Sequence, residues 1–388
     1  MHTHESLTSQ EASSQQLATI DLAAGYPRLA TRHRAAILRL LPASPPRNAY
    51  DNIDASLSLA VNRFLDPTRR GALHCLPTFS GSIAIQRAFE TFRVDAMRRG
   101  ATRIQAIVQT PTLDVIFSLA KELTRTEPIQ IPLGPTYTGI DASCDAFTAT
   151  LRRLSKLRRD TKYILTICSP NNPDGFVWPR EKLQDVAQVC AERDISLVVD
   201  HCFLTAGVHN QSEIATIWQI QVTGCRWLAI WDTGKTFDIA GEKLAFLLSD
   251  NESTVSMARN ALQVIQLDQP IRLKLLVQKL LSNGLGQLLV LHLHSLCKKN
   301  YAQLAQLQFS DARLLPLQAG SLALVDVTDC ALTASELRSA LLRLGLGLVH
   351  GQPFFGFGKS SPQLLRLALA RKPTYFKSAV STIKSVLS

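Results

Sequence analysis

Hydrophobic and polar positions follow two alternating periods along the chain from about residue 71 onward. Short apolar runs are typical of buried strands, and longer segments with an apolar residue every three or four positions are typical of helices. The predicted strands are Ala72–Leu76, Arg103–Val108, Ile129–Leu133, Tyr163–Cys168, Ser196–Asp200, Trp227–Trp231 and Leu244–Leu248. The predicted helices between them are Ser82–Arg98, Leu113–Leu123, Ala146–Leu157, Arg180–Glu192 and Ile214–Val222. This alternation predicts an α/β fold with a doubly wound, mainly parallel sheet of seven strands.

The two ends of the chain depart from this alternation. Residues 1–20 are rich in Ser, Thr and Gln and are predicted to form a mobile arm, which an amphipathic helix over Thr31–Leu41 follows. Two long helical stretches, Ser253–Leu281 and Leu285–Leu307, come after the last strand of the sheet. A smaller α+β unit then ends the chain, with strands near Ser321–Asp326 and Leu364–Leu369 and helices near Ala334–Leu342 and Tyr375–Ser385.

This pattern divides the chain into three parts. We expect an N-terminal arm and helix over 1–45, and a large domain over 46–285. A bridging helix with the small C-terminal domain takes up 286–388.

Composition narrows the class of protein. Of the 388 residues, 46% are hydrophobic and 19% are charged, which is typical of a packed globular chain and excludes a disordered one. No apolar run reaches the roughly 18 residues of a membrane span, so we expect no membrane partner. The first residues lack the pattern of a secretory signal, and the eight cysteines form no CxxC motif. Scattered thiols of this kind predict reduced cysteines in a cytoplasmic enzyme.

The net charge of +11 permits an anionic partner but does not demand one. The strongest candidate for nucleic-acid binding is the basic run from Arg152 to Arg159, which contains no aromatic residue. A solvated helix face explains this run better, so we expect no nucleic-acid partner. His292 and His294 are two residues apart and would not share a face of a helix, so we expect no metal site there.

Three polar motifs follow predicted strands. The turn from Ser169 to Gly175 contains Asn172, Asp200 ends the next strand, and Lys235 follows the strand after that. The carboxyl ends of parallel strands meet at one edge of a sheet, where doubly wound folds bind their ligands. A lysine at such an edge can form a Schiff base with an aldehyde, and a nearby carboxylate can keep a pyridine nitrogen protonated.

With these motifs in this order, the chain resembles the fold-type I pyridoxal-phosphate enzymes of the class I/II aminotransferase superfamily, from about residue 70 to the end. The resemblance implies pyridoxal 5'-phosphate as the cofactor, Lys235 as the Schiff-base lysine and Asp200 as the partner of the ring nitrogen. It further implies that Asn172 contacts the ring hydroxyl. The phosphate-binding residues would be Ser80, Gly81, Ser82 and Lys243. Arg366 would grip the α-carboxylate of an amino-acid substrate.

Several positions depart from the usual pattern of this superfamily. Phe203 stands where a tyrosine usually donates to the ring oxygen, and Leu113 stands where an aromatic residue usually covers the ring. Asp232 stands three residues before the lysine, where serine or threonine is common, and Lys243 replaces an arginine. Phe203 and Lys243, together with the stretch from Gly224 to Lys235, make the chain similar to the pyridoxal-phosphate enzymes of guanidino-amino-acid pathways. That group comprises arginine oxidases and hydroxylases and the capreomycidine and enduracididine synthases.

The narrower resemblance implies that Asp232 lies near a substrate guanidinium, and a carboxylate suits that planar cation. A structural aspartate bonded to Thr233 or Thr236 is the alternative for Asp232. Tyr26 occupies the place of a histidine that supports oxygen chemistry in the oxidases, which argues against oxidation here. Glu11 is a candidate to close over the substrate from the N-terminal arm, unless the arm leaves it disordered.

The sequence therefore predicts an enzyme acting on arginine or hydroxyarginine by Cα deprotonation, elimination and cyclisation to a cyclic guanidino amino acid of a natural-product pathway. The alternatives are an aminotransferase that uses a keto acid, and an arginine oxidase or hydroxylase. The partner is expected to be a small amino-acid substrate. Because the helical stretch 253–307 is long and apolar, we also expect a homodimer.

Overall fold

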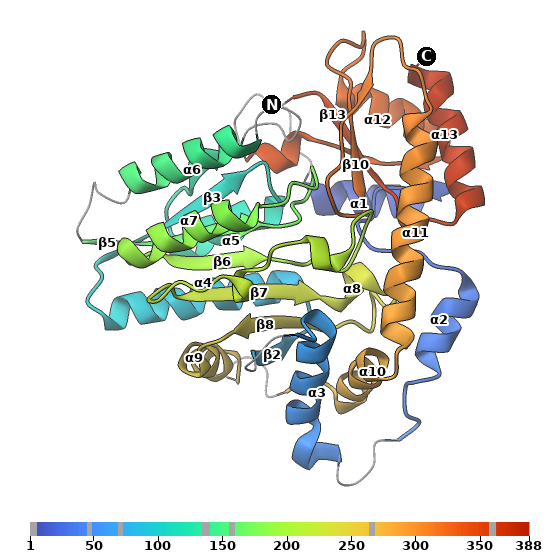
Figure 1. Cartoon of the computed structure of the whole chain (residues 1–388). Coiled ribbons are helices and arrows are strands. Elements are labelled where there is room, and N and C mark those ends of the chain that lie inside the picture. The colour runs from blue at the N-terminus through green and yellow to red at the C-terminus, as the bar shows by residue number, and fades with distance from the viewer. Residues whose placement is uncertain are drawn as a thin grey trace.

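The computed structural model describes residues 6–44, 49–68, 73–133, 140–154, 160–263, 268–356 and 362–387. Its centre is a seven-stranded sheet of order β2-β8-β7-β6-β5-β3-β4 (Figure 1). The strands are β2 (His74–Thr78), β3 (Arg103–Thr110), β4 (Ile129–Pro132), β5 (Thr161–Cys168), β6 (Ser196–Asp200), β7 (Trp227–Asp232) and β8 (Ala245–Ser249). Strand β8 runs antiparallel to both of its neighbours, β2 and β7, and the other six strands share one direction. The predicted α/β fold with a mainly parallel sheet is confirmed.

Helices cover both faces of the sheet, which is why the central strands are apolar over nearly their whole length. In Figure 1, α6 and α7 cross the front of the sheet, while α4 and α5 lie behind it. The bounds of these helices are α4 (Gly81–Arg98), α5 (Asp114–Thr124), α6 (Ile140–Leu154) and α7 (Arg180–Glu192). Every residue of β6 and β7 is buried, so side chains at the ends of these strands are held by a packed core.

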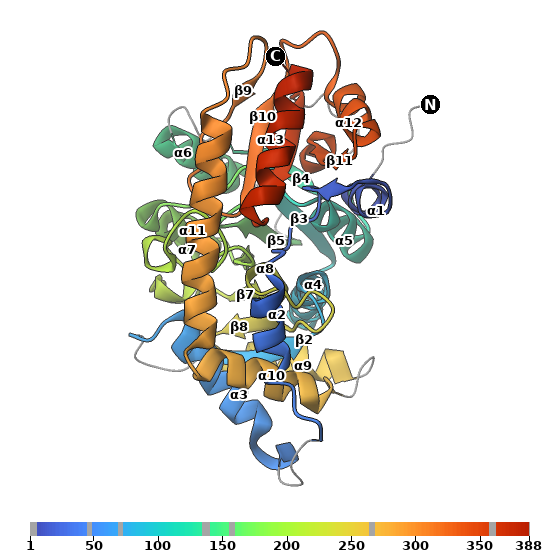
Figure 2. The same ribbon diagram turned by 90° about the vertical axis from the view of Figure 1, so that its right-hand side faces the viewer.

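A helical layer connects the sheet to the small domain. It consists of α3 (Ala49–Leu65), α10 (Ile271–Ser282) and α11 (Leu285–Ala305), whereas α9 (Glu252–Gln263) packs on α4 and on the strands β2 and β8. Helix α11 runs from α10 up to the small domain, where it packs along α13 (Figure 2). The stretch predicted as one helix over Ser253–Leu281 is two helices, because Pro270 stands at the start of α10 and cannot lie inside a helix. The sequence pattern did not predict α3.

The small domain is an antiparallel sheet of order β12-β13-β10-β9, covered by two helices. Its elements are β9 (Arg313–Leu314), β10 (Leu322–Asp326), α12 (Ala334–Arg343), β12 (Val349–His350), β13 (Leu364–Ala368) and α13 (Pro373–Leu387). A second small sheet pairs β1 (Ile20–Asp21) with β11 (Leu346–Gly347), so the start of the chain is tied to this domain. Helix α2 (Thr31–Leu38) follows and carries His33, whose ring meets that of His292.

The prediction of a mobile arm over residues 1–20 is wrong for its described part. Residues Leu7–Leu17 form helix α1, which Ser6 caps by accepting a hydrogen bond from the amide of Ser9. Leu7, Gln10 and Ser14 are buried against the small domain, and a Cβ at Gly347 would lie 2.6 Å from the Cβ of Ser14. The buried face of α1 is mostly polar, so a search for apolar periodicity could not find it.

The helix predicted over Ile214–Val222 is also absent. That segment contains one 3-10 turn, Ile217–Gln219, which follows another at Gln211–Glu213. Asn210 and Thr216 form capping boxes that satisfy the backbone locally, so the buried apolar residues need no continuous helix.

None of the helices in the described ranges has the length and apolar character needed to cross a membrane.

Candidate active site

The lysine singled out in the sequence lies at the carboxyl edge of the large sheet. Strand β7 ends at Asp232, and the single turn α8 (Thr233–Thr236) carries Lys235. The Nζ atom of Lys235 lies 5.7 Å from the ring centroid of Phe203. A Cβ at Gly25 would lie 3.8 Å from that Nζ. The amine is therefore bounded by an aromatic ring on one side and by backbone of the N-terminal segment on another.

Asp200 ends the neighbouring strand β6 and is buried. Its Oδ1 accepts a hydrogen bond of 2.8 Å from the amide of Cys202. Burial raises the pKa of Asp200, and the charge of Asp232 raises it further, while the Cys202 hydrogen bond and the charge of Lys235 lower it. A buried carboxylate near a lysine amine is thus available to hold a proton on a ligand.

The start of α4 forms an anion-binding corner beside these residues. Ser80 caps the helix, and the amide of Gly81 donates to Oδ2 of Asp232 at 3.2 Å. The Nζ atom of Lys243 lies 3.8 Å from the same oxygen. A Cβ at Gly81 would lie 3.2 Å from the Sγ of Cys202, so glycine suits this position. The positive end of a helix, the amide of Gly81 and a lysine together favour an anionic group.

Asp232 has different hydrogen-bond partners from those that the sequence suggested for a structural aspartate. Its Oδ1 accepts from the amide of Gly234 at 2.8 Å, and its Oδ2 accepts from Gly81. The hydroxyl of Thr233 donates instead to the carbonyl of Leu244 at 2.7 Å. Asp232 therefore lies at the junction of α4, α8 and Lys243, and it is 2% exposed.

Arg366 reaches the same edge from β13 of the small domain, where it is fully buried. Its Nη1 donates to Oδ1 of Asn172 at 3.1 Å, and its Nη2 donates to Oε1 of Glu11 at 2.8 Å. The Nε atom is buried and has no hydrogen-bond partner among the described residues. The guanidinium lies 5.2 Å from the ring centroid of Phe354. A buried arginine with an unused donor is suited to binding a carboxylate.

Tyr26 lies in the segment that passes over the lysine. Its hydroxyl accepts a hydrogen bond of 2.9 Å from Gln15 of α1, and its carbonyl accepts one of 2.8 Å from Arg371. Arg371 is buried and also donates to the carbonyls of Asp21 and Ala24. Burial lowers the pKa of Arg371 to about 10.

Sequence reasoning missed Arg371, which holds the whole segment from Asp21 to Tyr26 in place. The signal that could have found it is an arginine at the end of the apolar run from Leu364 to Ala370.

These residues fit a cofactor with an aldehyde, a protonatable ring nitrogen and a phosphate. Lys235 supplies the amine, Asp200 supplies a buried carboxylate, and α4 with Lys243 supplies the anion site. The amide of Gly81 already donates to an anionic oxygen, which shows that the corner accepts one. Pyridoxal 5'-phosphate has these three groups.

Comparisons with known proteins agree with this arrangement. The sequence profile of the family described as aminotransferase class I and II matches residues 117–383. The chain is 30% identical to mouse kynurenine–oxoglutarate transaminase 3 over 149 residues, which are 37% of this chain and 31% of that protein. It is 26% identical to histidinol-phosphate aminotransferase of Desulfitobacterium hafniense (strain DSM 10664 / DCB-2) over 215 residues, 55% of this chain and 52% of that protein. The matched region thus spans about a third to a half of these curated relatives.

Solved structures share the fold over nearly the whole chain. The N-succinyldiaminopimelate aminotransferase of Mycobacterium tuberculosis has a TM-score of 0.77 at 17% identity, covering 98% of this chain and 96% of its own. MppP, whose structure was solved after soaking with "the product 2-ketoarginine", has a TM-score of 0.71 at 19% identity, covering 95% of this chain and 99% of its own. At these identities the likeness concerns the fold.

Proposed function

The chain belongs to the aminotransferase class I and II family, whose members depend on pyridoxal 5'-phosphate, and from this premise we propose that it transforms an amino acid by removing the proton from its Cα. The burial of Arg366 at the carboxyl edge of the large sheet and the unused Nε–H of its side chain support the proposal most directly. A buried guanidinium with an unused Nε–H is a binding site for the substrate α-carboxylate. Arg366 also donates a hydrogen bond to Asn172, which lies at the same edge of the sheet as Lys235 and Asp200.

Each residue has a stated task in this proposal. Bound pyridoxal phosphate supplies an electron sink for negative charge at the substrate Cα. Asp200 holds a proton on the ring nitrogen, and Lys235 receives the Cα proton on its Nζ. Asn172 contacts the ring hydroxyl, while Ser80, Gly81, Ser82 and Lys243 bind the phosphate. The Phe203 ring beside Lys235 excludes water from one side of the amine.

We further propose that the substrate is arginine or a hydroxylated arginine. The carboxylate of Asp232 supports this choice, because it lies at the edge of the anion-binding corner, away from Arg366. A guanidinium beyond the α-carboxylate would meet negative charge there. The guanidino keto acid with which MppP was soaked also supports a substrate of this class. In hydroxyarginine the side-chain hydroxyl would leave as water, and attack by a guanidine nitrogen on the resulting double bond would close a ring without net oxidation. Arginine itself carries no such leaving group, so this ring closure applies to the hydroxylated substrate.

A plain aminotransferase is the second candidate, and the names of the curated relatives favour it. Oxidation or hydroxylation of arginine is disfavoured, because Tyr26 stands in place of the histidine of the oxidases and its hydroxyl is occupied by Gln15.

Incubation with arginine or 4-hydroxyarginine, with and without a keto acid, separates these reactions by mass spectrometry. We expect a product lighter than 4-hydroxyarginine by one water that forms without a keto acid and without consumption of oxygen. If the only product is the keto acid of the substrate, and it forms only when a second keto acid is present, the enzyme is an aminotransferase and the cyclisation proposal is wrong.

We also propose a homodimer in the cytoplasm. Leu288 and Leu291 lie one helical turn apart on α11 and are 65% and 60% exposed, and Leu59 on α3 is 50% exposed. Exposed leucines of this kind are typical of surfaces that a second copy covers. Light scattering at micromolar concentration should give about twice the chain mass of 42.7 kDa, and a value equal to that mass would contradict the dimer.

A further inference from the structure

We propose that Glu11 is an internal competitor for the substrate α-carboxylate, which pairs with Arg366 in the free enzyme and must leave it before an amino acid binds. This inference rests on the proposed function, in which Arg366 binds that carboxylate. It makes Glu11 a determinant of affinity for every α-amino acid, whatever its side chain.

The N–H donors of the Arg366 guanidinium limit how a carboxylate can bind to it. An arginine has five N–H bonds, and a carboxylate can be held by two parallel ones on either of two faces, Nε with Nη2 or Nη1 with Nη2. Both faces include Nη2. Here the two hydrogens of Nη2 are used by Oε1 of Glu11 at 2.8 Å and by the carbonyl of Ala23 at 2.5 Å. A substrate carboxylate therefore has no complete two-donor face until one of these acceptors leaves.

The carbonyl of Ala23 is the fixed acceptor. The amides of Ala23 and Ala24 donate to Oδ1 of Asp21 at 2.8 and 3.3 Å. Arg371 donates to the carbonyls of Asp21 and Ala24 on either side. Moving Ala23 would break these bonds in a buried segment, which is costly.

Glu11 is the acceptor that can leave. Its side chain is 25% exposed, so its carboxylate can rotate into water. The helix that carries it is held independently, since the amide of Leu7 donates to Asp114 at 2.9 Å and Gln10 accepts from the amide of His350 at 2.9 Å. Helix α1 lies beside α5 and β11, along the edge of the small domain (Figure 2). The helix can therefore stay docked while the Glu11 side chain gives way.

An internal ligand lowers the apparent affinity for an external one by the fraction of time that the site is free. Replacing Glu11 by Gln keeps the shape of the side chain and removes its charge. We expect Glu11→Gln to tighten binding of a neutral amino acid about tenfold, because a charged pair at a buried arginine is stronger than its neutral counterpart.

The test uses the holoenzyme and norleucine, which has an α-carboxylate but no guanidinium. Binding is read from the shift of the cofactor absorption band on titration, which requires no turnover. The matched control is Glu122→Gln, which removes an exposed carboxylate from α5, and Arg366→Gln removes the binding site itself. Thermal unfolding of each variant checks the fold, and Glu11→Ala repeats the test with a different side chain.

Tighter norleucine binding by Glu11→Gln or Glu11→Ala, with Glu122→Gln unchanged, supports the inference. Unchanged or weaker binding by the folded Glu11 variants, with a large loss in Arg366→Gln, overturns it and leaves the carboxylate site intact. Unchanged binding by Arg366→Gln overturns the proposed carboxylate site and this inference together.

Discussion

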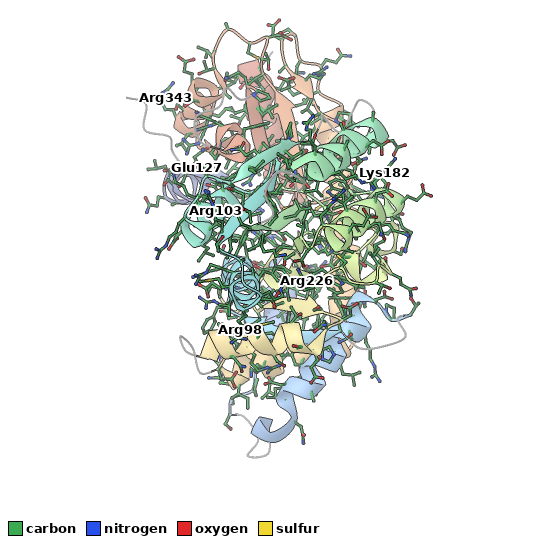
Figure 3. All side chains as sticks on the ribbon, turned by 90° about the vertical axis from the view of Figure 1, so that its left-hand side faces the viewer. Arg98, Arg103, Glu127, Lys182, Arg226 and Arg343 are labelled. Carbon is green, nitrogen blue, oxygen red and sulfur yellow. The ribbon has the colours of Figure 1, made fainter. Side chains whose placement is uncertain are left out.

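Two aspartates near opposite ends of strand β6 have opposite electrostatic surroundings. Asp194 precedes the strand at the amino edge of the sheet and accepts hydrogen bonds from Arg99, Lys162 and Arg226. Burial raises the pKa of Asp194, but these three cations outweigh it and hold the pKa below its usual range. Figure 3 views the molecule from this edge, with Arg226 labelled among charged side chains. At the other end, burial raises the pKa of Asp200 and its partners compensate only in part.

We interpret Asp194 as a structural charge and propose Asp200 as a functional one. At the amino edge, Asp194 is paired with cations of the protein itself, so its charge is not left for a ligand. At the carboxyl edge, the hydrogen bond from Cys202 and the charge of Lys235 offset the burial of Asp200 only in part, which is typical of sites where a ligand supplies the missing partner. Charged residues that are paired with one another therefore give little indication of a ligand site, whereas the buried charge at the carboxyl edge indicates one.

The largest effect is expected from Lys235→Ala. Removing the amine should abolish turnover and the absorption band of covalently bound cofactor, while circular dichroism and thermal unfolding show a folded protein. The physical reason is that the covalent bond to the cofactor aldehyde needs an amine at this place beside Asp200, and alanine has none. Cofactor that borohydride still traps on another lysine of the variant would contradict the assignment of this edge as the catalytic one.

The next effect in size is expected from Asp232→Asn, which tests whether a carboxylate at this edge reads the substrate. Losing one partner of a desolvated charge pair costs about 2–5 kcal/mol, or roughly 30- to 5,000-fold in affinity. Arginine should therefore bind far more weakly to the variant, while norleucine binds about as before, as measured by titration of the cofactor band. The introduced amide would retain an acceptor oxygen for the amide of Gly234. Its NH2 group would replace the oxygen that accepts from Gly81 and lies near Lys243, which leaves both of these groups to the cofactor phosphate, so the corner should keep its cofactor.

An equal loss of arginine and norleucine, or weaker retention of the cofactor, would show instead that Asp232 only supports the anion-binding corner through Gly81 and Lys243.

A smaller effect is expected at the amino edge, from Asp194→Asn. We expect a loss of about 1 kcal/mol in the free energy of unfolding at pH 7, because the ion pairs are partly exposed and screened by solvent. The folded pKa lies below the unfolded value of about 3.9, so the contribution is present above that pH and is lost as the pH falls through the folded pKa. Urea unfolding of both proteins at pH 7 measures the loss, and the difference between them should narrow when the series is continued from pH 4 to pH 2. An unchanged variant at pH 7 would contradict the prediction.

The smallest effect, of opposite sign, is expected from Asp200→Asn in the cofactor-free protein. The folded pKa of Asp200 is raised, so its contribution to stability is present below the unfolded pKa and is lost as the pH rises through the folded pKa. A neutral asparagine should then make the cofactor-free protein more stable at pH 7 by about 1 kcal/mol or less, with a loss of activity. Urea unfolding at pH 7 measures this change. A destabilised Asp200→Asn protein would show that both aspartates stabilise the fold, which contradicts the predicted difference between the two ends of β6.

The sequence determined the large sheet and which polar residues lie at its carboxyl edge. Apolar runs such as Ser196–Asp200 are local signals, and a polar residue at the end of a buried strand must lie at the sheet edge whatever surrounds it. That is why Asp200, Asn172 and Lys235 could be singled out without a structure. Pro270 is a helix-breaking signal that the sequence contains, but the apolar period continues on both sides of it, so the pattern predicts one helix where the structure has two.

Only the tertiary structure decided which distant groups meet. Helix α1 docks through Gln10 and Ser14, whose polar side chains carry no apolar period, and this docking brings Glu11 to Arg366 across 355 positions of sequence. Arg371 is buried because backbone carbonyls of the N-terminal segment surround it, and Asp232 faces Gly81 because α4 starts beside the end of β7. Such contacts join segments far apart in the chain, and their energy depends on burial and geometry that exist only after folding.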